Sequence, residues 1–233
     1  MNRTSIDWAD YSWNPVTGCL HGCDYCYARR IAERFGGPDG FKPTFHEERL
    51  SEPLWVKKPS RIFVGSMCDL FGDWVPQDWI THVLNAAWSA PQHQYLFLTK
   101  NPKRYHDLLH GNVAPNWWLG QTVTTKDEAL DEMVSGLHCA GWHTWLSAEP
   151  LLEDVADCIS WRGIDWLVIG AMTGPGSKNR QPKGEWVEGF TEQAIAHGVP
   201  VFHKRSLASV IVIPPDLIQW YPKAMLSLDG KTP

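Results

Sequence analysis

The sequence predicts an α/β fold in which about six parallel βα units form a partial TIM barrel. Apolar runs of strand length alternate with helical patterns along most of the chain. The runs are almost continuously apolar, which is typical of strands buried on both faces of a parallel sheet. The length of 233 residues fits a single domain of the barrel or doubly wound type. We therefore expect one domain over residues 1–233, with a core at about 8–205 and a tail at about 206–233.

A short first strand is predicted near Tyr11–Val16, and it would open the sheet. The later strands are recognised by apolar, β-branched and aromatic residues in runs of four to eight. They are predicted at Arg61–Met67, Tyr95–Thr99, Trp117–Thr122, Thr144–Ser147, Trp166–Gly170 and Val199–His203.

Helical patterns fill the segments between these strands. Their ends carry the usual signals, which are glycine after the last turn, proline at the first turn, and a capping box. We predict helices over Tyr27–Phe35 before Gly36, from Pro76 with an apolar stripe through Val83 and Ala87, from Thr125-x-x-Glu128 to near Gly141, and over Glu185–His197 before Gly198. The tail from Leu207 is rich in proline and apolar residues and carries no clear pattern.

Composition and charge exclude several classes of protein. The formal net charge is -5, which excludes a uniformly basic coat for nucleic acid but not a local basic patch. No run of about 18 apolar residues is present, so no transmembrane helix is expected. Because there is no charged-then-apolar export signal, the six cysteines favour a reducing cytoplasm.

One short segment carries most of the chemical information. Cys19, Cys23 and Cys26 have C-x3-C-x2-C spacing, and Tyr25 precedes the last cysteine. Three thiolates on one tight loop can hold three corners of a [4Fe–4S] cluster and leave the fourth iron open to a chelating small molecule. A disulfide framework would need oxidising conditions. A zinc site usually needs four ligands in two separated pairs, and His21, the nearest fourth ligand, lies inside the first loop.

This segment resembles the signature of radical S-adenosylmethionine (SAM) enzymes. The resemblance implies a [4Fe–4S] cluster whose open iron chelates SAM, and cleavage of SAM to a 5′-deoxyadenosyl radical that abstracts hydrogen from the substrate. It also implies an electron donor such as flavodoxin or ferredoxin. In barrels of this kind the chemistry lies at the carboxyl ends of the strands.

A narrower resemblance is to the phage Gp37/Gp68 family of radical-SAM-like proteins, from about Trp8 to about Arg205. The chain departs from that family after the sixth strand, where a Gly-Glu-Ser-Gly string is replaced by 170–174, Gly-Ala-Met-Thr-Gly. The matching strings are 13–19 (WNPVTGC), 65–71 (GSMCDLF), 98–102 (LTKNP), 118–120 (WLG), 146–152 (LSAEPLL) and 165–170 (DWLVIG).

The Cys68-Asp69 and Thr99-Lys100 steps are also similar to spore photoproduct lyase, a radical SAM enzyme that repairs DNA. The similarity implies that Lys100 pairs with the SAM carboxylate, a charge-assisted contact. Lys100 can equally be an ordinary lysine at a solvated strand end. The other predicted SAM-binding residues lie in the cysteine loop or near strand ends, where hydroxyls can instead bond the local backbone. They are Tyr25, Ser66, Asp69, Thr99, Gln121, Thr122, Ser147 and Glu149.

Two residues are candidates for catalysis. Glu149 follows a buried strand and precedes Pro150, which restricts it to extended geometry. It can bind the ribose, orient the substrate or accept a proton, or it can form a salt bridge to a lysine. Cys68 can return a hydrogen atom to a substrate radical, or it can be an inert buried thiol.

Basic residues that follow two of the strands predict an anionic substrate. Lys178 and Arg180 follow one strand, and Lys204 and Arg205 follow another. We expect them to line the path of a phosphate-bearing nucleotide or nucleic acid. The alternatives are solubilising charges, a small metabolite or peptide as substrate, and a non-enzymatic zinc-bearing binding module.

Overall fold

The computed structural model describes residues 1–109, 113–129, 141–210 and 217–226. The chain divides into two compact units, Met1–Trp118 and Leu119–Pro233, which are described separately. In each unit, helices follow strands that pair in parallel, so the predicted α/β class is confirmed.

The sheet of the first unit has the order β1 (Asn2–Arg3), β2 (Tyr11–Trp13), β5 (Arg61–Val64) and β6 (Gln94–Thr99). Strand β1 pairs with β2 in antiparallel fashion, whereas β2, β5 and β6 are parallel. Because parallel strands end at one edge, the segments after β5 and β6 emerge together. The cysteine loop is fastened to those segments, as described below.

The predicted first strand is divided in two. Strand β2 ends at Trp13, and β3 (Val16–Thr17) pairs instead with β4 (Thr44–Phe45) in a separate two-stranded sheet. Pro15 lies at the break, where it offers no N–H for a ladder. The chain thus leaves the main sheet just before the cysteines.

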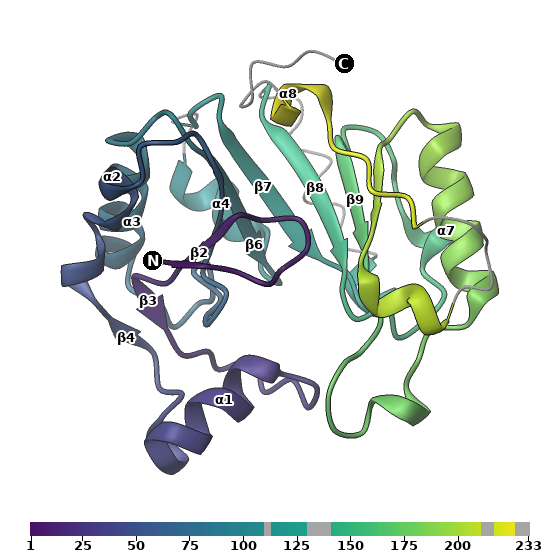
Figure 1. Cartoon of the computed structure of the whole chain (residues 1–233), viewed down its shortest axis with the longest axis horizontal. Helices are drawn as coiled ribbons and strands as arrows, with labels where there is room; N and C mark the ends of the chain where they lie inside the picture. Colours follow the sequence, from purple (N-terminus) through teal and green to yellow (C-terminus); the bar gives the residue numbers. More distant parts are fainter. Residues whose placement is uncertain (110–112, 130–140, 211–216, 227–233) are drawn as a thin grey trace. The chain divides into compact units, whose positions relative to one another are not determined.

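Six short or medium helices complete the first unit. They are α1 (Tyr27–Gly36), η1 (Gly37–Asp39), η2 (Glu47–Arg49), α2 (Glu52–Trp55), α3 (Gln77–Trp88) and α4 (Lys103–Leu109). Helix α3 begins after Pro76, as predicted, and buries Ile80, Val83 and Ala87. Figure 1 shows α1 near β3 and β4, apart from α2 and α3.

Aromatic and branched side chains form the core of the first unit. Trp13, Ile62, Leu96 and Phe97 are all but inaccessible, and Phe71 packs on Tyr105 with ring centroids 4.5 Å apart. Each large apolar side chain contributes about 1.5–3 kcal/mol when buried. This core holds the strand ends that carry the predicted site residues.

The second unit contains most of β7 (Trp117–Thr122), then β8 (His143–Ala148), β9 (Trp166–Ile169) and β10 (Val201–His203), in that order. Strands β8, β9 and β10 are parallel. Its helices are α5 (Lys126–Ala129), η3 (Ala156–Cys158), η4 (Ser177–Asn179), α7 (Gly184–Ala196), η5 (Arg205–Ser209) and α8 (Lys223–Leu226). Helix α7 runs beside β9 in Figure 1 and buries Val187 and Phe190 in the core of this unit.

Most predicted elements are present with ends that move by a few residues. The capping box is shifted: Glu128 accepts hydrogen bonds from the backbone N–H and hydroxyl of Thr124, both at 2.7 Å, rather than from Thr125. The helix is predicted to continue to near Gly141, but residues 130–140 lie outside the described part of the chain. Gln219, in the predicted tail, forms an isolated bridge with Phe202 of β10.

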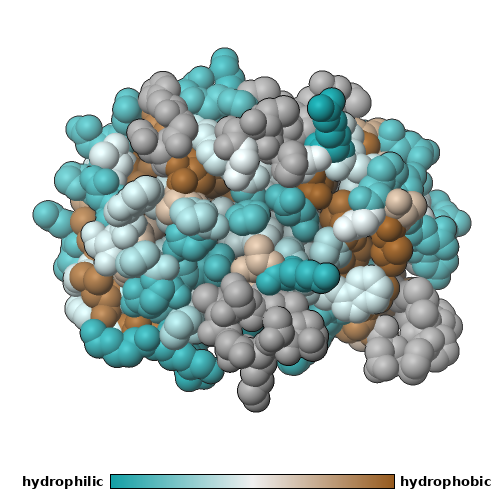
Figure 2. Space-filling view, turned by 90° about the horizontal axis from the view of Figure 1, so that it is seen from above, coloured by the Kyte–Doolittle hydropathy of each residue, from teal (hydrophilic) through white to brown (hydrophobic). Residues whose placement is uncertain are grey.

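Among the described residues, no helix has both the length and the apolar character needed to span a membrane. Figure 2 shows hydrophilic and hydrophobic residues side by side on one face of the molecule. A mixture of this kind is ordinary for a folded protein surface.

Candidate functional site

The three predicted cluster ligands lie on one loop, residues 19–26, which joins β3 to α1. We call this segment the cysteine loop. Its last residue, Cys26, is the N-cap of α1, and its Sγ accepts the Arg29 backbone N–H at 3.3 Å. The Cys26 side chain therefore caps the first turn of the helix.

A glycine fixes the entry to the cysteine loop. Gly18 has φ +88, and a Cβ at this position would overlap the Lys42 carbonyl. The Gly18 N–H donates to the Met67 carbonyl at 2.9 Å, and the next N–H, of Cys19, donates to Phe41 at 3.3 Å. Only glycine tolerates both the positive φ and the close approach. The contact therefore seats Cys19 beside the segment that follows β5.

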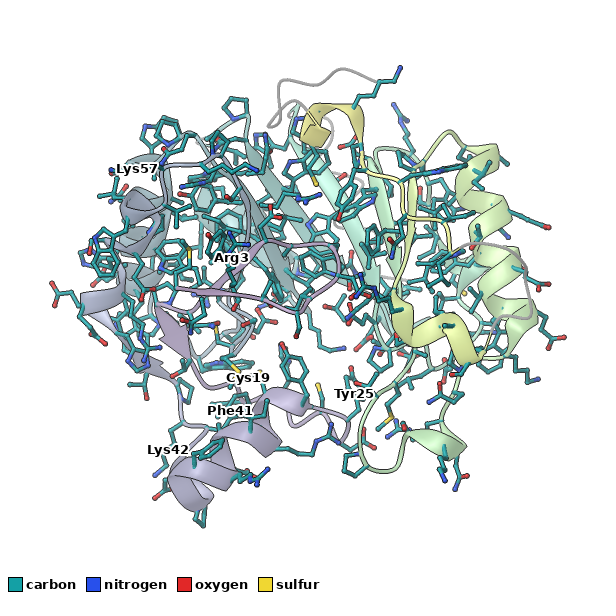
Figure 3. The ribbon with its side chains drawn as sticks, viewed as in Figure 1. Arg3, Cys19, Tyr25, Phe41, Lys42 and Lys57 are labelled. Carbon is teal, nitrogen blue, oxygen red and sulfur yellow. The ribbon has the colours of Figure 1, made fainter. Side chains whose placement is uncertain are left out.

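Arg29, in the first turn of α1, contacts the start of the cysteine loop. Its guanidinium donates to the Cys19 carbonyl at 3.3 Å and lies 5.6 Å from the centre of the Phe41 ring. Figure 3 shows Cys19 and Phe41 close together at the start of α1. The first and last cysteines are thus tied to the same helix.

The donor set fits an iron–sulfur cluster. Cys19, Cys23 and Cys26 are half-buried, and none forms a disulfide. Burial raises the pKa of Cys19 to about 11, with smaller contributions from Asp69 and the other two cysteines. In the described residues, no three His, Cys, Asp or Glu side chains converge as a single ion would require. A cluster makes no such demand, because each thiolate binds a different iron.

Asp69 connects the cysteine loop to the ends of two strands. Its buried carboxylate accepts from the Thr99 hydroxyl at 2.7 Å and the Phe71 N–H at 3.0 Å through Oδ1. Through Oδ2 it accepts from the Lys100 N–H at 2.9 Å, and it pairs with His21 Nε2 at 2.8 Å. One side chain therefore holds the loop, the segment after β5 and the end of β6 together.

Lys100 lies against the cysteine loop. Its side chain is half-buried, and Nζ is 5.7 Å from the centre of the Tyr25 ring. An ammonium at this distance from a ring face is attracted by the π electrons. The structure thus brings the predicted SAM-binding lysine to the residue before the last cysteine.

The hydroxyls of Thr99 and Ser66 are already engaged. Thr99 donates to Asp69 and accepts the Asn101 N–H at 2.9 Å. The Ser66 hydroxyl bonds the side-chain amide of Asn14 at 3.1–3.2 Å, and its carbonyl accepts from the Tyr27 hydroxyl at 2.7 Å. The Ser66 hydroxyl thus bonds a side chain 52 positions away rather than the local backbone that the sequence offered as an alternative.

Cys68 lies next to the cysteine loop. It forms an isolated bridge with Gly18, and burial raises its pKa well above the usual value, with help from the negative charge of Asp69. The side chain therefore remains a thiol, S–H, at neutral pH. That is the form that a hydrogen-atom donor requires.

In the second unit, Glu149 forms an ion pair with Lys204. Their side chains are 26% and 17% exposed. Gly170 lies against both, because a Cβ there would be 3.1 Å from Glu149 Cγ and from Lys204 Cδ. The salt bridge that the sequence offered as an alternative role for Glu149 is therefore present.

Ser147 has a polar atom without a protein partner. Its hydroxyl is buried and makes no hydrogen bond to the residues that the structure describes. On the neighbouring strand β7, Gln121 is buried and donates to the Glu128 carbonyl at 3.1 Å, while Thr122 is half-buried at the strand end. A buried hydroxyl with no partner is a position where a ligand atom can bind.

The predicted substrate-binding cations differ in exposure. Lys178 and Arg205 are exposed, Arg180 is half-buried, and Lys204 is engaged with Glu149. The loop that carries Lys178 is braced by Gln181, whose amide donates to the carbonyls of Met172 and Ser177. The prediction that these residues and the cysteine loop share one rim stays a prediction.

Sequence reasoning missed the positioning roles of His21, Asn14 and Arg29. His21 was considered as a zinc ligand, yet it binds Asp69 and packs edge-on against Trp74 with centroids 4.7 Å apart. Asn14 was noted as part of a motif, and its carboxamide also accepts the Met67 N–H at 2.9 Å. No local signal could have indicated this contact, because Met67 lies 53 positions from Asn14 in the chain.

Comparison with protein families gives one match over most of the chain. The model described as "Protein of unknown function (DUF5131)" matches residues 3–209. No curated protein sequence matches the chain.

Solved structures of spore photoproduct lyase share the fold. A single-residue variant is 10% identical over 87% of this chain and 78% of the lyase chain, with a TM-score of 0.58. The enzyme complexed with dinucleoside spore photoproduct is 12% identical over 82% of this chain, with a TM-score of 0.52, and a variant with bound AdoMet and the same dinucleoside gives 0.53. The chain spans 62% of the length of these two lyase chains. At such low identity the likeness establishes the α/β fold alone.

Proposed function

We propose that this chain, which belongs to the DUF5131 family, is a radical SAM enzyme. The observation that carries the proposal is the connection from the cysteine loop through His21 and Asp69 to Lys100. These hydrogen bonds join the loop that carries three thiols to the backbone of a lysine at the end of β6. The fold shared with spore photoproduct lyase supports the same proposal.

Cys19, Cys23 and Cys26 would ligate three irons of a [4Fe–4S] cluster. When bound, the cluster and SAM supply hydrogen-atom abstraction by a 5′-deoxyadenosyl radical. The chain's own contribution is to hold and shield this chemistry. Arg29 and Gly18 hold the start of the loop, and Cys26, at its end, caps the first turn of α1.

Lys100 would bind the carboxylate of SAM. Its ammonium already lies against Tyr25 in the cysteine loop, so a carboxylate chelated near the loop falls within its reach. We assign Asp69 and Thr99 to positioning, because their polar atoms are committed to one another and to the backbone of Phe71, Lys100 and Asn101.

In the second unit, Ser147 is the strongest candidate for a ligand contact because its buried hydroxyl has no partner among the described residues. Gln121, Thr122 and the Glu149–Lys204 pair are the further candidates there. Cys68, a protonated thiol beside Cys19, is the candidate donor of a returning hydrogen atom.

The substrate that we propose carries phosphate and is a nucleotide or a nucleic acid. Two of the solved lyase structures that share the fold hold a dinucleoside, which supports a substrate of the nucleoside type. The phosphate is proposed because Lys178, Arg180 and Arg205 place cationic groups in the second unit of an acidic chain. Phosphate contacts make binding fall steeply with salt concentration.

The test is anaerobic reconstitution with iron, sulfide and a chemical reductant, followed by measurement of 5′-deoxyadenosine with and without DNA oligonucleotides. The proposal expects 5′-deoxyadenosine from the natural chain and none from Cys26→Ala. Cys158→Ala is the matched control, since Cys158 is also half-buried and lies in η3 outside the cysteine loop. Loss of activity in both variants, or in neither, would contradict the assignment.

A further inference from the structure

Two exposed tryptophans lie where helices α2 and α3 end. Trp55, the last residue of α2, is 67% exposed, and Trp88, the last residue of α3, is 57% exposed. Lys57 and Lys58 follow Trp55 within three residues and are exposed, and Leu54, just before it, is 42% exposed. We call these five residues the α2–α3 surface.

Hydrogen bonds join the segment after α3 to α2 and the residue that follows it. The amide of Gln92 donates to the Val56 carbonyl at 3.2 Å, and Nε2 of the buried His93 donates to the Pro53 carbonyl at 3.0 Å. Figure 1 shows α2 and α3 beside one another in the first unit. Trp88, four residues before Gln92, is therefore held near the end of α2.

The ring of Trp88 is supported by the core of the first unit. It meets the ring of the buried Trp117 edge-on, with centroids 5.9 Å apart and an angle of 88° between the planes. Trp117 in turn packs edge-on against Phe97, with centroids 5.5 Å apart. A large flat ring that is held in place and still more than half exposed can stack on another ring with little loss of side-chain freedom.

The α2–α3 surface lies at the end of the sheet opposite the cysteine loop. Lys57 precedes β5 and Trp88 precedes β6, whereas the residues that are hydrogen-bonded to the loop follow those strands. The six residues of β6 span about 20 Å, at about 3.3 Å per residue. Figure 3 shows Lys57 near the top of the first unit and Cys19 near its lower end. The surface is therefore separate from the candidate SAM site.

The charge of the α2–α3 surface is positive, in a chain whose net charge is -5. An ammonium has three N–H groups, and Lys57 Nζ donates one of them to the Leu54 carbonyl at 3.1 Å, which leaves two for a ligand. Two acidic residues of this part of the chain are already paired. Glu52, the first residue of α2, pairs with the N-terminal ammonium, and Asp10 pairs with Arg61 at 3.1 Å. The lysine charges can therefore attract an anion.

We propose that the α2–α3 surface binds a single strand of nucleic acid, with bases stacked on Trp55 and Trp88 and phosphates paired with Lys57 and Lys58. Every base offers a flat π face and every nucleotide carries a phosphate, so one strand provides partners for both kinds of side chain. The surface is remote from the cysteine loop and would hold a strand outside the proposed reaction site. The inference thus goes beyond the proposed function and does not depend on radical chemistry.

An anionic membrane is a poorer match for the α2–α3 surface. Tryptophan and lysine also occur on helices that lie in a membrane interface, but those helices bury an extended apolar face in the lipid. Helix α2 has only four residues, and Leu54 is the one aliphatic member of the surface. The flat rings and ammonium groups instead match the bases and phosphates of a strand.

The experiment titrates labelled oligomers of thymidine deoxynucleotides and of uridine nucleotides, each about 12 nucleotides long, with the full-length chain after treatment with iron and sulfide. Fluorescence anisotropy at several salt concentrations gives Kd. We expect Trp55→Ala and Trp88→Ala each to raise Kd at least about fivefold and to leave its salt dependence unchanged. Lys57→Gln and Lys58→Gln should each make the slope of log Kd against log salt concentration shallower by about 0.7.

The matched controls are Trp220→Ala and Lys223→Gln in the second unit, where Trp220 is 53% exposed and Lys223 is exposed. Both should bind like the natural chain. Circular dichroism checks that each variant folds, and Trp55→Ala decides the question if Trp88→Ala does not fold. The titration needs neither a cluster nor SAM, so a failure to form 5′-deoxyadenosine would count against the proposed function alone.

Three results would overturn the inference. The first is that neither oligomer binds, or that the four variants bind like the natural chain. The second is an affinity that falls in Lys178→Gln and Arg180→Gln but not in the four variants, because the strand would then occupy only the proposed substrate path. The third is binding to vesicles of phosphatidylserine and phosphatidylcholine that the tryptophan variants abolish while oligomer affinity is unchanged, which would assign the surface to a membrane. Tighter binding of one oligomer would show whether DNA or RNA is preferred, and either preference supports the inference.

Discussion

At the scale of single residues, the candidate site depends on what each polar side chain contacts. The carboxylate of Asp69 accepts from three donors in the chain and pairs with His21, so it has little capacity left for a ligand. The ammonium of Lys100 lies 5.7 Å from the centre of the Tyr25 ring in the cysteine loop. We propose different roles for these two neighbours, ligand binding for Lys100 and positioning for Asp69.

Lys100→Ala should weaken SAM binding and leave the cluster in place. A lost charge-assisted hydrogen bond is worth about 1.5–3 kcal/mol, or roughly ten- to hundredfold in Kd. Equilibrium dialysis of SAM against reconstituted protein measures it, with the exposed Lys103→Ala as control. An unchanged Kd for Lys100→Ala would remove this lysine from the site.

Asp69→Asn should destabilise the first unit by about 1–3 kcal/mol, because an amide cannot accept from all the donors that now face the carboxylate. Urea unfolding of the cluster-free chain measures the loss. Asp73→Asn is the control, since the Asp73 side chain accepts a bond from Asn101 but is exposed. Equal stability of the two variants would show that Asp69 does not fasten the loop.

At the scale of elements, the cysteine loop is held at both of its ends and by Asp69. Gly18 joins it to the segment after β5, and Cys26 begins α1. Two glycines of this region, Gly18 and Gly22, share a positive φ but differ in their surroundings. Alanine substitutions at the two positions therefore separate the cost of a positive φ from the cost of steric overlap.

Gly18→Ala should cost clearly more stability than Gly22→Ala in the cluster-free chain. Both substitutions place alanine at positive φ, which costs about 1–2 kcal/mol. At Gly18 the new Cβ also meets the Lys42 carbonyl, whereas at Gly22 nothing lies within 4 Å. Urea unfolding of both variants checks this, and equal losses would mean that the loop entry is looser than the structure indicates.

At the scale of the whole molecule, pH should affect stability through a buried histidine of the second unit. Burial lowers the pKa of His203 from 6.5 to about 4. Thr191 donates its hydroxyl to the Val187 carbonyl at 2.6 Å, so His203 Nε2, at 2.8 Å, is the donor to Thr191 Oγ1. The imidazole is thus neutral in the folded chain.

Because the folded pKa is below the unfolded value, the contribution of His203 is complete above about pH 6.5. It is lost as the pH falls toward 4, and the full shift corresponds to about 3 kcal/mol. Unfolding free energies at pH 7 and pH 4.5 measure the slope. His203→Gln should flatten it, whereas the exposed His197→Gln should not. An equally steep slope in His203→Gln would refute this origin.

Sequence alone was sufficient for the buried strands of the main sheet from β5 onward and for the cysteine loop, since both follow from local patterns, whereas it did not indicate the short strands β1 and β4 or the break before β3. Continuous apolar runs located β6 and β7 within a residue, and cysteine spacing located the three thiols. The Asp69 connections join residues 48, 30 and 31 positions apart, and no local pattern encodes them. The sequence also did not indicate that Ile31 and Phe35 of α1 are exposed, because a four-residue apolar spacing predicts a helix but not which side is covered.

The central claim is that the cysteine loop holds a cluster with one iron open to SAM. Electron paramagnetic resonance of the reduced, reconstituted chain, recorded with and without SAM, tests it most directly. The account predicts a [4Fe–4S] signal, with about four irons per chain, that changes when SAM is added. A chain that binds zinc in place of iron, or a cluster signal that SAM leaves unchanged, would contradict it.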